Sequence, residues 1–182
     1  MTVSVRKRYS HKYAFLLSYT YSSNKDNLLT GDVGSTFSDN NNPGGDFGPS
    51  NQSVPHTFVA SGLADLPWRF KLAGIYTWRS GLAFSPRGLK DLDGDGLVDQ
   101  RDTTVARNSF RTKAYCTLDA RLEKVFKIGG RNSFSALAEG FNLFNRDNVK
   151  NITNVSGDQF GTPTEYFSGR EIQFGVRYNF GG

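Results

Sequence analysis

The chain has 182 residues, enough for one domain with a core of its own, and carries a formal net charge of +5. Its Lys and Arg residues are scattered in ones and twos apart from the RKR cluster at 6–8, which excludes the basic stripe of a nucleic-acid-binding protein, so we expect no nucleic-acid partner. The 20 Gly and 15 Phe residues, the single Met and the scarcity of helical periodicity favour an all-β protein, and the lone Cys116 excludes an intrachain disulfide.

Seven segments alternate apolar and polar residues with a period of two, the pattern that predicts β-strands. In chain order they are residues 3–9, 12–23, 56–64, 68–80, 114–126, 132–142 and 170–180. Each presents an apolar face and a polar face, and the alternation is clearest in the last segment. In 132–142 both faces are mixed, because Leu137 and Phe141 oppose Phe134 and Ala136, so alternation does not fix the register of this strand.

The connections between these strands alternate in length. Tight turns are predicted at 10–12, 65–67 and 128–131, and long loops rich in Asn, Gly, Asp, Ser and Pro at 24–54, 82–112 and 144–168. In an antiparallel meander, all the short turns then lie at one end of the sheet and all the long loops at the other.

Aromatic residues bracket the apolar faces. Trp68 and Trp78 begin and end one such face, and at roughly 3.3 Å per residue and a tilt of about 40° they span roughly 25 Å, the height of the apolar band of an outer-membrane barrel. Tyr13 and Tyr19 enclose the apolar face of an earlier strand in the same way. We therefore predict a membrane aromatic belt made of Tyr13, Tyr19, Tyr21, Trp68, Tyr76, Trp78, Tyr178 and Phe180. The alternative is a soluble β-sandwich with these rings in its core.

Charged residues occupy the opposite faces and would line the lumen of a barrel. The predicted lumenal charges are Arg69, Lys71, Asp119, Arg121, Glu123, Glu139, Glu171 and Arg177. A watered lumen accepts such charges, whereas the filled interior of a small barrel does not without pairing. With a tight turn near Ile128, Arg121 would join Asp119, Glu123 and the diagonal Glu139 in one cluster. In the alternative, this face is the solvated outside of a sandwich.

Seven strands do not make a complete bacterial barrel, because single-chain barrels have even strand numbers from eight upwards and open edges are not tolerated in lipid. We therefore expect an all-β, antiparallel transmembrane β-barrel fragment of about seven meandering strands, with three long external loops and three short periplasmic turns. It would be the C-terminal part of a larger barrel or would close with other copies. No run of about 18 apolar residues occurs. The start MTVSVRKRYS lacks the apolar stretch of a signal peptide, so we expect the export signal upstream.

Two stretches carry a family resemblance, namely 107–148 and FGTPTEYFSGREIQFGVRYNF at 160–180. Together with RKRYSHKYAFLLSYTYSSNKD near the start, they resemble the C-terminal barrel end of TonB-dependent outer-membrane receptors, in the group with a carboxypeptidase-regulatory-like N-terminal domain. The most specific piece is FNLFNR, which begins at Phe141. Its Asn residues can satisfy backbone groups where the ladder of a strand ends.

The resemblance implies a barrel of about 22 strands that is plugged by an N-terminal domain and lies in the outer membrane of a Gram-negative bacterium. The expected function is energy-coupled uptake of a scarce substrate, without enzymatic activity, and the chain alone should transport nothing. The implied partners are outer-membrane lipid, the plug and remaining strands, an inner-membrane energy-coupling protein and the outer-membrane assembly machinery. Val176, Tyr178 and Phe180 resemble the family's assembly signal, although Gly181 and Gly182 follow where the family usually ends.

The stretch DLDGDGLVDQRD at 91–102 has the ligand spacing of a calcium loop. The candidate metal ligands are Asp91, Asp93, Asp95, Leu97 through its carbonyl, Asp99 and Asp102. Gly96 stands where the loop needs a sharp turn, but Asp102 replaces the usual bidentate Glu and no amphipathic helices flank the motif. We therefore expect weak calcium binding, at roughly 10⁻⁴ to 10⁻³ M, that orders an external loop.

Two other functions fit parts of the sequence. One is a soluble, calcium-stabilised β-sandwich that binds a partner. The other is an outer-membrane hydrolase that uses His56 near Ser53, but no motif sets a nucleophile and a base at meaningful spacing. No motif marks the residues that contact a substrate.

Overall fold

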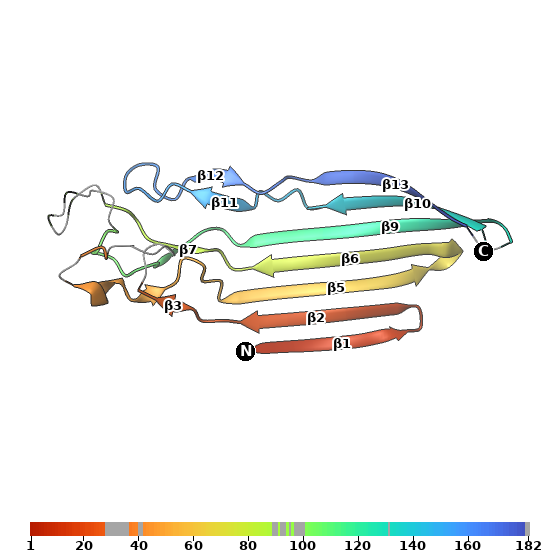
Figure 1. Ribbon diagram of the computed structural model, residues 1–182, viewed down its shortest axis with the longest axis horizontal. Coiled ribbons are helices and arrows are strands. Elements are labelled where there is room, and N and C mark those ends of the chain that lie inside the picture. The colour runs from red at the N-terminus through yellow and green to blue at the C-terminus, as the bar shows by residue number, and fades with distance from the viewer. Residues whose placement is uncertain are drawn as a thin grey trace.

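A computed structural model describes residues 1–27, 37–39, 42–88, 91, 94, 96, 101–130 and 132–180. Its main feature is an antiparallel sheet of seven strands in the order β1-β2-β5-β6-β9-β10-β13 (Figure 1). The strands are β1 (Thr2–Ser10), β2 (Tyr13–Tyr21), β5 (His56–Leu66), β6 (Phe70–Arg79), β9 (Tyr115–Gly129), β10 (Asn132–Phe141) and β13 (Glu171–Asn179). The predicted all-β meander, with long loops at one end and short turns at the other, is confirmed.

The long loops contain short elements that the sequence does not predict. These are the hairpin pairs β3 (Lys25–Asp26) with β4 (Gly48–Pro49), β7 (Ala83–Phe84) with β8 (Phe110–Arg111), and β11 (Val149–Ile152) with β12 (Pro163–Tyr166), and the 3₁₀ turn η1 (Pro43–Asp46). Such ladders are too short to show an alternating pattern. We call the segments 22–55, 80–114 and 142–170 loop 1, loop 2 and loop 3. Among the described residues, no helix has the length and apolar character needed to cross a membrane.

The strand register places the more apolar faces of all seven strands on the same side of the sheet. Leu72 lies opposite Ala64 and Leu122, and directly opposed residues project to the same side of a sheet. The next position, Lys71, lies opposite Asp65 and Glu123 and belongs to the other face. We call these the apolar face and the polar face of the wall.

The register also settles β10, whose alternation is mixed. Phe134 lies opposite Phe126 on one side and Tyr178 on the other, so it belongs to the apolar face. Leu137 lies opposite Glu123 and therefore belongs to the polar face. Pairing with two well-patterned neighbours thus determines the orientation of a strand whose own sequence is ambiguous.

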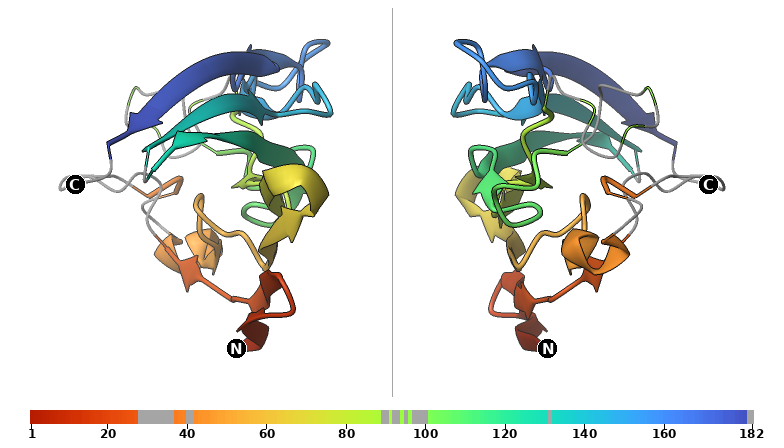
Figure 2. Two further views of the ribbon diagram at one scale, coloured as in Figure 1. Left: turned by 90° about the vertical axis from the view of Figure 1, so that its right-hand side faces the viewer. Right: turned by 90° about the vertical axis from the view of Figure 1, so that its left-hand side faces the viewer.

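The wall has almost no core of its own. Within the part of the chain that the structure describes, the buried hydrophobic residues are Ala83, Cys116 and Val149, whereas Phe174 and Val176 on the apolar face are 82% and 70% exposed. Figure 2 shows the strands as a curved wall that does not close, with β1 and β13 at its two edges and the segment around η1 on its concave side. No second sheet of described residues covers the apolar face.

The turn between β5 and β6 differs from the predicted one. Pro67, Trp68 and Arg69 form the 3₁₀ turn η2, in which Trp68 and Arg69 both have left-handed backbones, with φ of 56° and 62°. These conformations end the pleat, so β6 begins at Phe70 and not at Trp68. The predicted span from Trp68 to Trp78 along one strand is therefore wrong, and strand alternation does not assign Arg69 to a face.

Candidate functional site at the loop end and on the polar face

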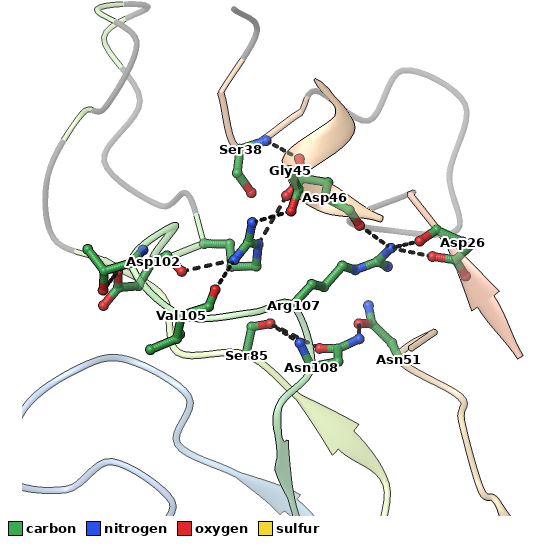
Figure 3. A network of polar contacts seen from close by, with 12 residues as sticks. Asp26, Ser38, Gly45, Asp46, Asn51, Ser85, Asp102, Val105, Arg107 and Asn108 are labelled. Atoms are coloured by element: carbon green, nitrogen blue, oxygen red, sulfur yellow. Dashed lines mark hydrogen bonds and ion pairs between the residues drawn. The ribbon is translucent and has the colours of Figure 1, made fainter. Parts of the chain in front are cut away.

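A buried ion pair joins loops 1 and 2 (Figure 3). Arg101 Nε donates to Asp46 Oδ1 at 3.0 Å, and the two side chains are 5% and 1% exposed. The remaining donors of Arg101 reach the carbonyl oxygens of Gly45, Asp102 and Val105 at 2.7 to 3.0 Å. A buried charge is costly unless it is paired and hydrogen-bonded. Because the Arg101 guanidinium has both an ion-pair partner and carbonyl acceptors, it holds the two loops together.

Two further residues of loop 2 extend this junction. Arg107 Nη1 donates to the carbonyl oxygen of Asp46 at 2.9 Å and forms an ion pair with Asp26 of β3. Asn108 Nδ2 donates to the carbonyl oxygen of Pro49 at 2.6 Å and to Asn51 Oδ1 at 2.8 Å. Loop 1 is thus held by loop 2 at both of its short strands.

A polar hollow of about 300 Å³ adjoins the ion pair. Asp39, Asn42 and Thr103 line it together with residues 104–106. Ser38, which donates its backbone N–H to Asp46 Oδ2 at 2.7 Å, also borders the hollow. The junction is therefore a hydrophilic surface at the loop end of the wall.

Loop 3 is attached to loop 2 by aromatic rings and by backbone. Phe84, Phe110 and Phe160 form a cluster with centroid separations of 5.0 to 5.8 Å. Next to it, the backbone N–H of Arg87 donates to the carbonyl oxygen of Asn154 at 2.7 Å, and the N–H of Ser156 donates back to Arg87 at 3.0 Å. All three loops therefore form one connected layer.

The polar face carries most of the predicted lumenal charges. By register, Lys71, Asp119, Arg121, Glu123, Glu139, Glu171 and Arg177 all lie on it. Arg121 pairs with Glu123 and Glu139 at 3.5 Å each, and Glu139 lies directly opposite Arg121 rather than diagonal to it as predicted. Arg177 reaches Glu123 at 4.0 Å across the intervening strand β10.

Asp119 is the exception in that cluster. Its Oδ1 accepts the backbone N–H of Asn142 at 2.8 Å, at the point where β10 ends. Asp119 thus supports the start of loop 3. Near the turns, Tyr9 donates its hydroxyl to Asp65, and both residues line a groove of about 470 Å³ together with Lys71 and Glu123.

The predicted belt residues fall into two groups on the apolar face. Tyr19, Tyr21 and Trp78 lie at its loop end, with Tyr76 one pair further in, and Tyr13 and Tyr178 lie near the turns. Trp68 lies in the η2 turn instead, and Phe180 follows the end of β13. Val176 and Tyr178, the first two residues of the predicted assembly signal, pair with Ala136 and Phe134.

Two lysines on the apolar face lie close to the turns. Lys7 Nζ lies 3.7 Å from the ring centroid of Tyr13 and donates to the carbonyl oxygen of Ser10 at 2.8 Å. Lys124 Nζ lies 4.3 Å from the ring centroid of Phe70 and donates to the carbonyl oxygen of Trp68. Both ammonium groups thus leave the apolar surface for the turn backbone, as expected of lysines at a membrane interface.

The FNLFNR stretch is built around Asn residues at the end of β10. Asn142 and Asn145 have left-handed backbones, with φ of 47° and 48°, which Asn tolerates better than most residues. Asn142 Nδ2 donates to the carbonyl oxygens of Arg146 and Ser168 at 3.0 and 3.3 Å. Asn145 Oδ1 accepts the backbone N–H of Arg170 at 3.0 Å. The two side chains thus join the start of loop 3 to its end.

Asn148 makes a further contact that the sequence does not predict. Its Oδ1 accepts the backbone N–H of Cys116 at 2.8 Å, and its Nδ2 donates to the carbonyl oxygen of Cys116 at 2.9 Å. The side chain therefore takes the place of a neighbouring strand for one residue of β9. It is 1% exposed, so both bonds are shielded from water.

The predicted calcium loop is only partly described. Asp93, Asp95, Leu97 and Asp99 lie outside the described residues. Asp91 accepts the backbone N–H groups of Gly94 and Gly96 at 2.7 and 2.9 Å. Asp102 accepts the N–H and hydroxyl of Thr104, and these bonds, the hydroxyl first, hold its pKa below the ordinary value. In the described ranges, no three His, Cys, Asp or Glu residues gather as metal ligands would.

The residues weighed for a hydrolase do not pair. His56 Nδ1 lies 2.7 Å from the hydroxyl of Tyr19. Ser53 Oγ accepts from Arg111 Nη2 at 3.4 Å. The structure thus joins each to a different partner.

A family model described as an outer membrane beta barrel domain matches residues 1–106 and 102–173 of the chain. The matched segments run from β1 into β13, so they cover the wall together with its three loops. No curated protein and no solved structure matches.

Proposed function

The chain belongs to the outer membrane β-barrel domain family, and from that premise we propose that it forms part of a TonB-dependent receptor. The receptor takes up a scarce substrate across the outer membrane of a Gram-negative bacterium, with energy relayed from the inner membrane. The chain supplies a section of the barrel wall and part of the external mouth, and it performs no catalysis. The plug and the other strands come from elsewhere in the assembled receptor.

The open, one-sided wall carries this proposal. The apolar face continues over all seven strands, yet β1 and β13 each pair with a single described strand. Unpaired backbone groups at a strand edge are not tolerated in lipid. Further strands must therefore complete the barrel, and the likeness to TonB-dependent receptors favours strands of a longer protein over other copies of this chain.

The orientation of the two faces follows from their chemistry. The apolar face contacts lipid, and Lys7 and Lys124 mark its periplasmic rim. The polar face lines the water-filled interior, where Arg121 forms ion pairs with Glu123 and Glu139. The joined loops 1, 2 and 3 then form part of the external mouth.

The soluble sandwich has less support. A sandwich packs the apolar faces of two sheets about 10 Å apart, but no described strand packs on this one. Ile172 and Phe174 would have to be covered by a partner in water, whereas lipid covers them in a barrel. The family match also favours the membrane wall.

The proposal is tested by expressing the gene that carries this chain and isolating its product from outer membranes. Mass spectrometry gives the length of the mature protein, and affinity capture tests whether the inner-membrane energy-coupling protein is bound. A longer protein that captures the coupling protein supports TonB-dependent uptake. A 182-residue protein that closes from its own copies and captures nothing overturns it.

A further inference from the structure

An arginine on the polar face, at the loop end of β6, lies among aromatic rings. The guanidinium carbon of Arg79 lies 4.4 Å from the ring centroid of Tyr115, which is directly opposite on β9, and 6.0 Å from that of Phe167. The two rings meet edge to face at 5.4 Å. Within the described part of the chain, these ring contacts are the only interactions of the Arg79 guanidinium, which has no carboxylate partner.

A second guanidinium at this end of the wall, that of Arg111, likewise has no carboxylate partner among the residues that the structure describes. Arg111 Nη1 donates to the carbonyl oxygens of Ser53 and Gly81 at 2.9 and 3.0 Å, and Gly81 follows Arg79 by two residues. Towards the turns, by contrast, Arg121 and Arg177 both have glutamate partners. Among the described residues, Arg79 and Arg111 thus lack the carboxylate partners that Arg121 and Arg177 have.

Three threonines lie near Arg79 in the register of the same face. Thr57 lies directly opposite it on β5, and Thr77 pairs with Thr117 one row further in. Stacking on a ring engages the flat side of a guanidinium and leaves its N–H edge free. That edge matches the two oxygens of a carboxylate or phosphate, and neighbouring hydroxyls can add single hydrogen bonds.

We propose that Arg79, Tyr115 and Phe167 form a contact site for an oxyanion group, carboxylate or phosphate, on the substrate that passes through the barrel. The rings hold the guanidinium in place and offer a planar surface to the part of the substrate next to the anion. This assignment rests on the proposed function, because the site lies on the substrate path only if the polar face lines the interior.

The test measures binding of phenyl phosphate and of benzoate, with phenol as the neutral comparison. Titrations use the protein purified from outer membranes in a zwitterionic detergent. Removing the charge with Arg79→Gln should weaken binding of at least one anion by about tenfold or more. The anion that binds more tightly identifies the oxyanion class. Arg79→Lys keeps the positive charge but loses the planar, bidentate guanidinium, so its affinity for the anion should lie between those of the wild type and Arg79→Gln.

Arg6→Gln is the control, since Arg6 is another arginine of the polar face, lies opposite Leu16, and has no aromatic contact among the described residues. It should leave the affinities unchanged. The proposal is overturned if the wild type and Arg79→Gln bind the anions with equal affinity, or if phenol binds as well as both anions. It is also overturned if the wild type binds neither anion while its circular dichroism shows intact strands. The assay does not depend on energy coupling, so failure of TonB-dependent uptake and failure of this site are distinguishable.

Discussion

Asp46 and Arg101 stand 55 positions apart in the chain, yet their side chains meet at 3.0 Å in one of the least exposed places of the molecule. Each belongs to a different loop, and each would be left as an unpaired buried charge without the other. Removal of one partner of such a pair usually costs far more than the pair itself contributes, because the remaining charge cannot be hydrated.

Asp46→Ala should therefore loosen the junction of loops 1 and 2, at a local cost of about 3 to 5 kcal/mol. Limited proteolysis in detergent should show faster nicking within 42–55 and 101–108, while the strands remain protected. Asp147→Ala is the control, because Asp147 is exposed. Equal nicking in the two variants would show that the ion pair does not hold the loops together.

A charged substitution on the apolar face should destabilise the protein only if that face contacts lipid. Leu72→Arg should cost roughly 2 to 4 kcal/mol and reduce assembly into outer membranes. Ile75→Arg is matched to it, since Ile75 is on the same strand and is 50% exposed but lies on the polar face opposite Asp119. We expect Ile75→Arg to assemble normally. If both variants assemble alike in membranes and resist urea equally, the assignment of the faces is wrong.

The side chain of Asn148 should stabilise the loop end of β9, where it bonds to Cys116. Asn148→Ala leaves the N–H and the carbonyl of Cys116 without their partners, at about 1 to 3 kcal/mol for each buried group. Hydrogen exchange of the Cys116 amide should accelerate while that of Leu122 is unchanged. Asn154→Ala, in the same loop, serves as the control. Unchanged exchange at Cys116 would mean that water replaces the amide at no cost.

The pH dependence of loop 2 should follow Asp102. Hydrogen bonds from the Thr104 hydroxyl and backbone N–H lower the pKa of Asp102 below its ordinary value of 3.8. A depressed folded-state pKa means that the stabilisation is fully present above the ordinary pKa and is lost as the pH falls through the folded-state pKa. Thr104→Val should move the pKa, read from the carboxyl ¹³C shift, upwards toward 3.8, whereas Thr103→Val should not. An unshifted titration in Thr104→Val would exclude the hydroxyl as the main cause.

Calcium binding by the 91–102 motif remains a prediction from ligand spacing. Millimolar calcium should slow proteolytic nicking within 85–106, with half-saturation at roughly 10⁻⁴ to 10⁻³ M, and magnesium should act less because it requires a tighter octahedral site. Asp91→Asn should abolish the protection, and Asp147→Asn should not. Nicking that is indifferent to calcium in the wild type would leave the motif as an acidic turn.

Much of the wall could be predicted because a half-buried strand has a period of two, which is visible in β2, β6 and β13. The facing of β10 could not, since it depends on pairing with β9 and β13 rather than on its own residues. Trp68 was misplaced for a related reason. Alternation runs through Trp68 in the sequence, but the left-handed turn that begins at Pro67 interrupts it, and only the Pro gives a hint.

The loop junction was beyond sequence reasoning. Asp46, Arg101 and Asn108 look like ordinary residues of polar loops, and their burial arises from contacts between segments that are distant in sequence. Asn142 and Asn145 are different, because Asn favours left-handed positions and bonds to nearby backbone. Both belong to FNLFNR, the most specific piece of the family resemblance, and their left-handed backbones and backbone contacts account for Asn at these positions.

The order of strands in the wall is the order of strands in the chain, so each ladder of the seven-stranded sheet joins consecutive long strands. One pair of strands with its loop could therefore be duplicated or lost, and the path of the chain between the other strands would not change. The pore would widen or narrow by two strands, and the change would preserve even parity. Because barrel diameter grows with strand number, such an architecture lets gene duplication enlarge the opening in discrete steps.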